Sequence, residues 1–350
     1  MLLLSLLLAC TPTDDRANER AEAPLRVNDI SAVGTHNSYK LPMPPEVMEA
    51  IRKKDARAAE ALDYAHRPLN EQLDRGARQI ELDVNRDPEG GYYSVPGEAI
   101  PELDAPGFKV LHIAGIDNGS TCLQLKQCLR ILRAWSDAHP RHVPILLMVN
   151  AKESDNEALG RPALRFDEAA FDALDADIRS ILPPEKLITP DDVQGDYASL
   201  REAVLANNWP RLDEARGRFL FALDEGPEKV AIYRGERASL EGRVFFINTD
   251  EHSPAAAYLT LNDPIAEGDR IREAVEAGFL VRTRADADTR EARADDDTRF
   301  QAALASGAQY ISTDYLWSDP RFSDYRVGLP GGVAARANPV RRDAACSITE

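Results

Sequence analysis

The sequence predicts a single α/β domain of the (β/α)8 TIM-barrel type. Three observations favour this fold. Eight short β-rich runs alternate with longer amphipathic segments, the runs end in polar or ionisable residues, and no glycine-rich nucleotide-binding loop follows the first run. The length of 350 residues fits one such barrel with extensions.

The β-rich runs supply the strands of the expected barrel. They are Asp29–Gly34, Arg78–Val84, Lys109–Ile113, Pro144–Val149, Arg218–Leu223, Arg243–Ile247, Gly278–Val281 and Gln309–Ser312. Segments between them, such as Asp167–Ile181 and Asp269–Ala277, carry apolar residues at helical spacing. A doubly wound open sheet shows the same alternation, but its usual phosphate-binding loop is missing after the first run. We therefore favour the barrel.

The strand-like runs end in residues that can carry chemistry. These are His36 and Asn37, Glu81 and Asp83, His112, Asn150 and Lys152, Asp224 and Glu225, Asn248, Arg282, and Thr313 and Asp314. In a parallel barrel the active site is built from the carboxyl ends of several strands. The distribution therefore predicts one catalytic face.

The composition is that of a globular, acidic protein. Hydrophobic residues make up 43% of the chain, charged residues 29%, and the formal net charge is -17. Such a balance disfavours nonspecific attraction to nucleic-acid backbones and to anionic bilayers. We expect no nucleic-acid partner, and we expect a monomer.

The first ten residues form an apolar run that ends in a small residue before Cys10. The run resembles the end of a bacterial lipoprotein signal, in which Cys10 would carry lipid, and it is too short to span a bilayer. Residues 11–26 then read as a flexible tether, 27–330 as the barrel and 331–350 as a C-terminal tail. We expect export to the bacterial cell envelope, with the protein either anchored to a membrane surface through Cys10 or secreted.

The cysteines fit an oxidising compartment. Cys122 and Cys128 enclose five residues, a spacing that can close a small disulfide loop. A zinc site is the competing interpretation, but no second pair or nearby histidine cluster completes four ligands. If Cys10 carries lipid and Cys122 bonds to Cys128, Cys346 is left unpaired near the C-terminus.

Two carboxylates in the second β-rich run indicate a cation. Glu81 and Asp83 are two residues apart, so on a strand both side chains point to the same side. Like charges so placed repel unless a cation lies between them. Together with Asn37 they offer only oxygen ligands, which suit calcium and, by ligand type alone, magnesium. Ion pairs with nearby arginine or lysine side chains are the alternative.

Two histidines at strand ends suggest acid–base chemistry on a phosphodiester. Such a reaction requires removal of a proton from the attacking oxygen, delivery of a proton to the leaving oxygen, and stabilisation of charge on the phosphoryl oxygens. His36 and His112 can share the proton transfers, and a metal ion with Lys152 can hold the anion.

Several stretches together resemble the calcium-dependent branch of the phosphatidylinositol-specific phospholipase C superfamily, whose members are barrel phosphodiesterases. The matching stretches are Thr35–Tyr39, His66–Leu69 with Gln72, Leu73 and Gly76, Gln79–Asp83, His112, Pro144–Lys152, Gly278–Arg284 and Gly307–Tyr315. They span nearly the whole expected domain, and their combination is specific although each piece alone is not.

The resemblance implies a catalytic pair and a calcium site. His36 and His112 would be the catalytic histidines, and Asn37, Glu81 and Asp83 would be calcium ligands. The inositol 2-hydroxyl would attack phosphorus, His36 would stabilise the phosphoryl oxygens, and His112 would protonate the departing diacylglycerol oxygen. A cyclic inositol phosphate would form. The group that removes the 2-hydroxyl proton stays open, with Glu81 as a candidate.

One position departs from the pattern of eukaryotic relatives. Asn150 stands where they place a carboxylate ligand, and an amide oxygen brings no charge, so calcium affinity should be weaker. Lys152 is expected to hold the phosphate. Arg282 and Arg284 lie on one side of a strand, and we favour Arg282 for substrate binding.

Other functions remain open from the sequence. A glycerophosphodiester phosphodiesterase or a phospholipase D-type hydrolase could use the same barrel with water as the nucleophile. A non-catalytic headgroup-binding lipoprotein is the alternative of another class, although the presence of both His36 and His112 argues against it. The true headgroup, and whether the substrate is a lipid at all, also stay open.

Overall fold

A computed structural model describes residues 24–95, 97, 99–153, 155, 160–342 and 347–350. The strands are β1 (Ile30–Thr35), β2 (Gln79–Asn85), β3 (Lys109–Val110), β4 (Ile145–Lys152), β5 (Leu187–Ile188), β6 (Phe219–Leu223), β7 (Phe245–Ile247), β8 (Tyr258–Thr260), β9 (Leu280–Arg284), β10 (Tyr310–Thr313) and β11 (Ala335–Ala337). The α-helices are α2 (Pro45–Lys54), α3 (Ala56–Leu62), α4 (Leu69–Asp74), α5 (Pro101–Asp104), α6 (Leu125–Ala138), α7 (Glu168–Ile181), α8 (Pro190–Gln194), α9 (Leu200–Leu205), α10 (Leu212–Ala215), α11 (Pro227–Arg234), α12 (Gly268–Ala277), α13 (Arg290–Ala294) and α14 (Thr298–Ser306). Short 3-10 turns are η1 (Val27–Asp29), η3 (Pro184–Lys186) and η4 (Pro330–Gly332).

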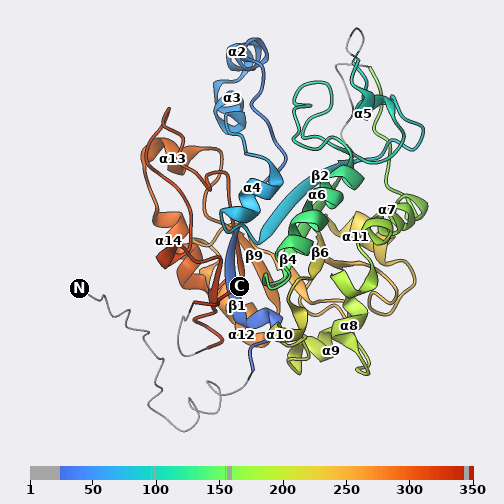
Figure 1. The fold of residues 1–350 in the computed structure, drawn as a ribbon, viewed down its shortest axis with the longest axis vertical. Coiled ribbons are helices and arrows are strands. Elements are labelled where there is room, and N and C mark those ends of the chain that lie inside the picture. Colours follow the sequence, from blue (N-terminus) through green and yellow to red (C-terminus); the bar gives the residue numbers. More distant parts are fainter. Residues whose placement is uncertain (1–23, 96, 98, 154, 156–159, 343–346) are drawn as a thin grey trace.

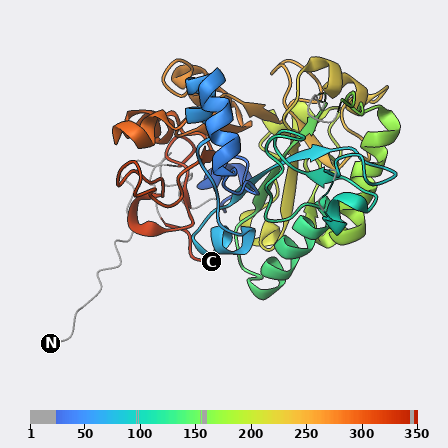
Figure 2. The ribbon, with the colours of Figure 1, turned by 90° about the horizontal axis from the view of Figure 1, so that it is seen from above.

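The strands form two sheets surrounded by helices (Figures 1 and 2). One sheet has the order β11-β1-β10-β9-β8, and the other has the order β3-β2-β4-β6-β5 with β7 also paired to β6. All pairings are parallel except those of β3 with β2 and of β11 with β1. The carboxyl ends of the parallel strands therefore lie on one face, as the expected barrel requires.

The two sheets meet at two seams, and no continuous ladder crosses either seam in the described part of the chain. At the first seam, the Arg78 N–H donates to the Val33 carbonyl at 2.8 Å. Gly34 makes this close approach possible, because a Cβ there would lie 2.4 Å from the Gln79 carbonyl oxygen. At the second seam a single bridge joins Asn248 to β8. The fold is thus of the barrel type, with its wall interrupted between β1 and β2 and between β7 and β8.

Seven of the eight predicted runs are strands of this barrel, and one prediction was wrong. The run Lys109–Ile113 contributes only the two-residue strand β3, which pairs antiparallel to the end of β2 at the sheet edge. The eighth strand of the barrel wall is instead β8, only three residues long, and the two-residue β5 adds a further parallel pairing to β6. So short a run gives too little pattern to separate a strand from a loop.

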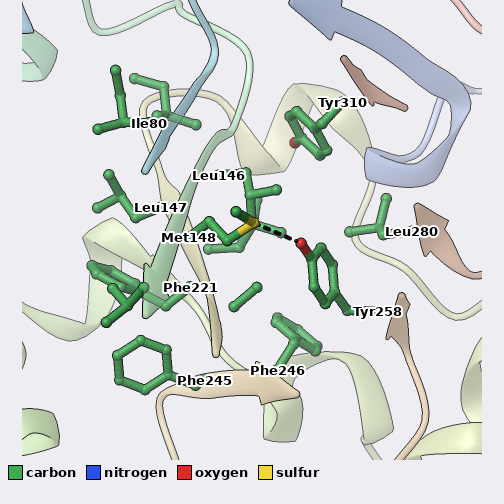
Figure 3. Packing of buried hydrophobic residues seen from close by; sticks show 14 of the residues in the cluster. Ile80, Leu146, Leu147, Met148, Phe221, Phe245, Phe246, Tyr258, Leu280 and Tyr310 are labelled. Atoms are coloured by element: carbon green, nitrogen blue, oxygen red, sulfur yellow. Dashed lines mark hydrogen bonds between the residues drawn. The ribbon is translucent and has the colours of Figure 1, made fainter. Parts of the chain in front are cut away.

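Part of the core lies between the strands of the two sheets, inside the barrel (Figure 3). Met148 on β4, Phe221 on β6 and Tyr258 on β8 are almost fully buried, and the Tyr258 hydroxyl donates to the Met148 sulfur at 3.1 Å. Strands buried on both faces read as continuous apolar runs, which explains the sequences Ile145–Val149 and Phe219–Leu223.

The predicted helices around the barrel are present. Helix α7 begins after Asp167, whose side chain accepts a hydrogen bond from the Ala170 N–H. Helix α12 ends at Gly278, which has φ 109°, a value that side-chain-bearing residues rarely adopt. Figure 1 shows α2 and α3 standing apart from the barrel at the top of the view.

Outside the barrel strands, the structure describes the disulfide loop and most of the C-terminal segment. A disulfide joins Cys122 to Cys128, as predicted. After residue 330, β11 pairs with β1, and the Glu350 carboxylate forms an ion pair with Arg78. The predictions for Cys10 and Cys346 lie outside the described residues. Within the part that is described, no helix has the length and apolar character needed to cross a membrane.

Candidate active site

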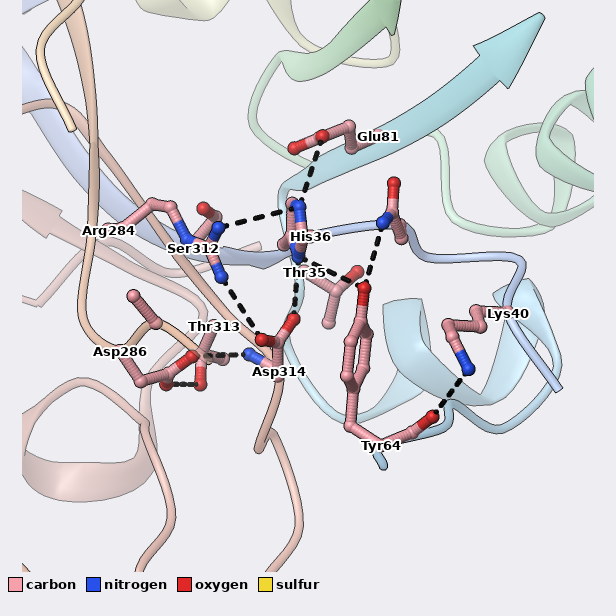
Figure 4. A network of polar contacts seen from close by, with 12 residues as sticks. Thr35, His36, Lys40, Tyr64, Glu81, Arg284, Asp286, Ser312, Thr313 and Asp314 are labelled. Atoms are coloured by element: carbon pink, nitrogen blue, oxygen red, sulfur yellow. Dashed lines mark hydrogen bonds and ion pairs between the residues drawn. The ribbon is translucent and has the colours of Figure 1, made fainter. Parts of the chain in front are cut away.

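His36 lies directly after β1 among side chains from three other strands or strand ends (Figure 4). Its Nδ1 is 2.8 Å from Asp314 Oδ1, and its Nε2 is 3.7 Å from Glu81 Oε1. Arg284 contacts both His36 and Asp314, with Nη1 3.5 Å from His36 Nε2 and Nη2 3.0 Å from Asp314 Oδ2. The imidazole is therefore fixed by Asp314 through Nδ1, while Nε2 faces the site.

The surroundings of His36 keep the imidazole neutral. Burial and the adjacent Arg284 lower the pKa of His36 to about 3, although Asp314 opposes the shift. The side chain is still 19% exposed. With the Nδ1 proton directed at the Asp314 carboxylate, the Nε2 lone pair is available to accept a proton.

Both carboxylates on β2 contact side chains of the neighbouring strand β4. Glu81 Oε2 accepts from Arg282 at 2.7 Å, and Glu81 Oε1 accepts from the Asn150 amide at 3.2 Å. Asp83 Oδ2 is 3.2 Å from Lys152 Nζ. Burial raises the pKa of the Glu81 carboxyl to about 8, with Arg282 opposing the rise. Both carboxylates thus already have a cationic neighbour.

Asn37 has a backbone conformation that few residues adopt. Its φ of 46° lies in the left-handed region, which asparagine tolerates better than most residues. Its side-chain amide donates to the Tyr64 hydroxyl at 2.8 Å. Because this bond uses the nitrogen, the amide oxygen is the atom that Asn37 can offer to a cation.

The donor set fits a hard cation in kind. Glu81, Asp83, Asn37 and Asn150 offer carboxylate and amide oxygens, which are the ligands that calcium prefers. Among the described residues, no group of three or more histidine, cysteine, aspartate or glutamate side chains is arranged to hold a metal. A calcium ion here would have two carboxylate ligands and would share them with Arg282 and Lys152.

His112 belongs to a loop and not to a strand. It follows β3, and the preceding residue, Leu111, is held against β2 because its carbonyl accepts from the Asn85 amide at 2.9 Å. His112 Nδ1 is 2.9 Å from Asp117 Oδ2, and the imidazole is 15% exposed. Asp117 also forms an ion pair with Lys40 at 3.3 Å. His112 is thus oriented by a buried carboxylate, as His36 is.

The structure brings most of the predicted residues together. His36, Glu81, Asn150 and Arg282 are joined by direct contacts, and the Asp83–Lys152 pair follows on the same two strands. His112 is joined to this group only through intermediate side chains. The residues to which the sequence assigned no role, and which orient the histidines, are Asp314, Asp117, Lys40 and Tyr64. Only Asp314 had a signal, its place at a strand end.

Comparison with known proteins identifies the family. A family model described as phosphoinositide phospholipase C, Ca2+-dependent, matches residues 25–339. The chain belongs to this family. It is therefore an enzyme of the phosphoric diester hydrolase class. No curated protein matches the chain.

Solved structures of similar fold include two bacterial phospholipases. A calcium-dependent phosphoinositol-specific phospholipase C from Pseudomonas sp is 19% identical, with a TM-score of 0.56, and the match covers 90% of this chain and 96% of that one. A Ca2+-dependent phosphatidylinositol-specific phospholipase C from Streptomyces antibioticus is 21% identical, with a TM-score of 0.52 and coverage of 83% and 95%. At this identity the two structures establish the shared barrel-type fold.

Proposed function

We propose that this family member is a calcium-dependent phospholipase C that cleaves phosphatidylinositol or a related inositol phosphodiester. One observation carries the proposal. His36 and His112 are each held at Nδ1 by a buried carboxylate, Asp314 and Asp117 respectively. In each imidazole Nε2 is therefore the nitrogen left for proton transfer. Two such histidines match the two proton transfers that cleavage by an internal hydroxyl requires.

The reaction is proposed as an internal displacement. The inositol 2-hydroxyl oxygen forms a bond to phosphorus while its proton passes to His36 Nε2. The bond from phosphorus to the diacylglycerol oxygen breaks, and that oxygen takes the Nε2 proton of His112. The products are a cyclic inositol phosphate and diacylglycerol, which balance the atoms of the substrate.

We propose His36, and not Glu81, as the group that accepts the 2-hydroxyl proton. The family resemblance implied that His36 stabilises the phosphoryl oxygens, but burial and Arg284 lower its pKa to about 3, which disfavours the charged form that would do so. A neutral imidazole is suited to accept a proton. Both Glu81 oxygens already accept hydrogen bonds, Oε2 from Arg282 at 2.7 Å and Oε1 from the Asn150 amide at 3.2 Å, so it is their geometry that disfavours Glu81 as the acceptor.

Positive charge for the phosphate is proposed to come from Lys152, Arg282 and Arg284. The first two residues form ion pairs with the carboxylates on β2, and Arg284 lies beside His36. Calcium would be held by Asn37, Glu81, Asp83 and Asn150. When bound, it would supply further charge to stabilise the phosphoryl oxygens. Because Asn150 is uncharged, we expect weak calcium affinity.

The cellular location of the enzyme is also a proposal. We propose that it is exported to the bacterial cell envelope and that lipid at Cys10 holds it near its phospholipid substrate. A single acyl chain gives limited anchoring unless Cys10 carries several of them. A soluble inositol phosphodiester is the alternative substrate. Extraction of the protein with detergent, followed by mass measurement of the N-terminal peptide, tests the lipid at Cys10.

Phosphorus NMR of the reaction tests the function. The protein is incubated with phosphatidylinositol and calcium, with a chelator as the matched condition. A cyclic inositol phosphate that requires calcium supports the proposal. Phosphatidic acid or a glycerol phosphate would instead indicate a water-attacking hydrolase. Binding of the lipid without turnover would indicate a headgroup-binding protein.

A further inference from the structure

Lys40 is a buried cation that no proposed step of the reaction uses. Its side chain is 0% exposed, and its Nζ lies 3.3 Å from Asp117 Oδ2. The same oxygen lies 2.9 Å from Nδ1 of His112. Burying an ammonium group costs much free energy even when it is paired, and an apolar side chain would fill the same space at a lower cost. The position of Lys40 therefore points to a role in the site.

Lys40 also contacts Tyr64, which lies beside His36 (Figure 4). The Lys40 ammonium donates to the Tyr64 carbonyl at 3.0 Å and lies 4.9 Å from the centre of the Tyr64 ring. That ring stacks on the His36 imidazole with 5.8 Å between centroids. Lys40 thus has a defined place between the two catalytic histidines.

The orientation of Asp117 rests on Lys40. Asp117 Oδ1 has no side-chain or backbone hydrogen-bond partner within the described part of the chain, so Oδ2 makes both of its close contacts. Without the ammonium, His112 alone would hold a carboxylate that is 1% exposed. Such a carboxylate can rotate, and its bond to Nδ1 then no longer fixes the imidazole.

We propose that Lys40 is a positioning residue for His112, acting through Asp117. By holding the carboxylate in place, it keeps the imidazole Nδ1 proton directed at Asp117 and presents Nε2 to the leaving oxygen. This inference rests on the proposed function, in which His112 protonates the leaving group. The proposal adds Lys40 to the active site, although its role is to hold Asp117 and not to take part in a proton transfer.

The chain offers a matched control for a buried lysine. Lys109 is also 0% exposed, and its Nζ lies 2.9 Å from Oδ2 of the buried Asp87. It also donates to two backbone carbonyls, those of Ala105 and Gly107. Neither member of this pair contacts a histidine among the residues that the structure describes. A Lys109→Met change therefore repeats the loss of a buried ammonium without touching the site.

Two substrates with different leaving groups separate positioning from general damage. Phosphatidylinositol releases an alkoxide that must be protonated, whereas a nitrophenyl inositol phosphate releases a phenolate that leaves without a proton. Loss of general-acid catalysis should therefore slow the first reaction far more than the second. Loss of folded protein slows both equally.

We expect Lys40→Met to lower kcat on phosphatidylinositol roughly 100-fold and on the nitrophenyl substrate less than about 5-fold. Lys109→Met should change both rates by the same factor. Lys40→Met added to His112→Ala should lower the lipid rate by less than about 2-fold further, because the two residues act as one unit. If Lys40→Met does not fold, Lys40→Arg replaces it and should also lower the lipid rate selectively, since its planar head cannot hold Asp117 in the same place.

The outcomes separate the two proposals. Equal losses on both substrates for both Lys40 variants, with a selective loss for His112→Ala, would overturn the role of Lys40 and leave the proposed function standing. A His112→Ala variant with no selective loss on the lipid would overturn the assignment of His112 as the acid.

Discussion

The two candidate catalytic histidines lie in different kinds of structure. His36 directly follows β1, and its neighbours Glu81, Arg284 and Asp314 come from three other strands or strand ends. His112 follows a two-residue strand and is oriented by Asp117 from its own loop. Cations therefore act on them differently. Arg284 contacts His36 directly, whereas Lys40 reaches His112 only through a carboxylate.

The difference teaches how one fold can give two imidazoles separate tasks. Burial beside an arginine favours a neutral His36, for which we propose the role of proton acceptor. A carboxylate shared by Lys40 and His112 orients the other imidazole, for which we propose the role of proton donor. The step proposed for His36 should therefore be sensitive to charge changes on the strands. The step proposed for His112 should be sensitive to changes in its loop.

The largest effect is expected from Arg284→Met. The change removes a cation beside His36, and kcat should fall about 10²- to 10³-fold. It should also raise the pKa of His36 from about 3 toward its ordinary value, since Arg284 lowers it. Activity on the acid side should then be lost at a higher pH than in the native enzyme. The kcat/KM profile from pH 4 to 8 measures this shift.

Arg243→Met serves as the control for Arg284→Met. Arg243 is buried, whereas Arg284 is partly exposed, and Arg243 pairs with Asp172 and Asp175 on α7, away from both histidines. Its loss should lower stability and leave the pH profile in place. An Arg284→Met profile with an unchanged acid limb would contradict the effect of Arg284 on His36.

A smaller effect is expected from Asn150→Asp. The change adds a carboxylate to the proposed calcium ligands, so calcium should bind roughly tenfold more tightly. Without calcium the variant should unfold at a lower temperature than the native protein, because the bond from Asn150 to Glu81 is replaced by repulsion. Titration calorimetry and thermal unfolding in chelator measure the two changes.

Asn208→Asp provides a comparison far from the strand ends. The Asn208 amide donates to the Val193 carbonyl and has no contact with the proposed ligands. Calcium affinity should stay the same in this variant. Unchanged affinity in Asn150→Asp as well would remove Asn150 from the ligand set.

A pH effect on stability is expected from Glu81 in the absence of calcium. Burial raises the pKa of this carboxyl from 4.5 to about 8, so the folded protein holds a proton there that the unfolded chain has lost. The free energy of unfolding in chelator should therefore fall as pH rises from about 4.5 to about 8. Glu81→Gln should make this fall smaller. Urea unfolding at several pH values tests it, and an equal pH dependence in the variant would contradict the assignment.

The smallest effect is expected from replacing Cys122 and Cys128 by serine. The disulfide closes a short loop, and its loss should lower the free energy of unfolding by about 2 kcal/mol. Because this loop adjoins the one that carries His112, the lipid rate should fall a few-fold more than the rate on a nitrophenyl substrate. Equal losses on both substrates would show that the disulfide does not help to position His112.

The sequence predicted well which residues of the site lie on or directly after strands. Glu81 and Asp83 share a face because they are two residues apart on a strand, and His36 and Asn150 lie at strand ends where a barrel places its site. These are local patterns with a fixed period, so they can be read without a structure.

The contacts made by residues in loops could not be predicted in the same way. The contact of Lys40 with Asp117 joins residues far apart in the sequence, and the stacking of Tyr64 on His36 depends on the path of the segment that contains α2 and α3. Neither has a spacing rule. Strand β8 was missed for a related reason, because three residues do not establish a period.

The central claim is that His36 accepts a proton and His112 donates one. The most direct test compares His36→Ala and His112→Ala on phosphatidylinositol and on a nitrophenyl inositol phosphate, in saturating calcium. We expect His36→Ala to lose at least about 10²-fold on both substrates, and His112→Ala to lose that much only on the lipid. Equal losses on both substrates for His112→Ala, or a selective loss for His36→Ala, would contradict this division of roles.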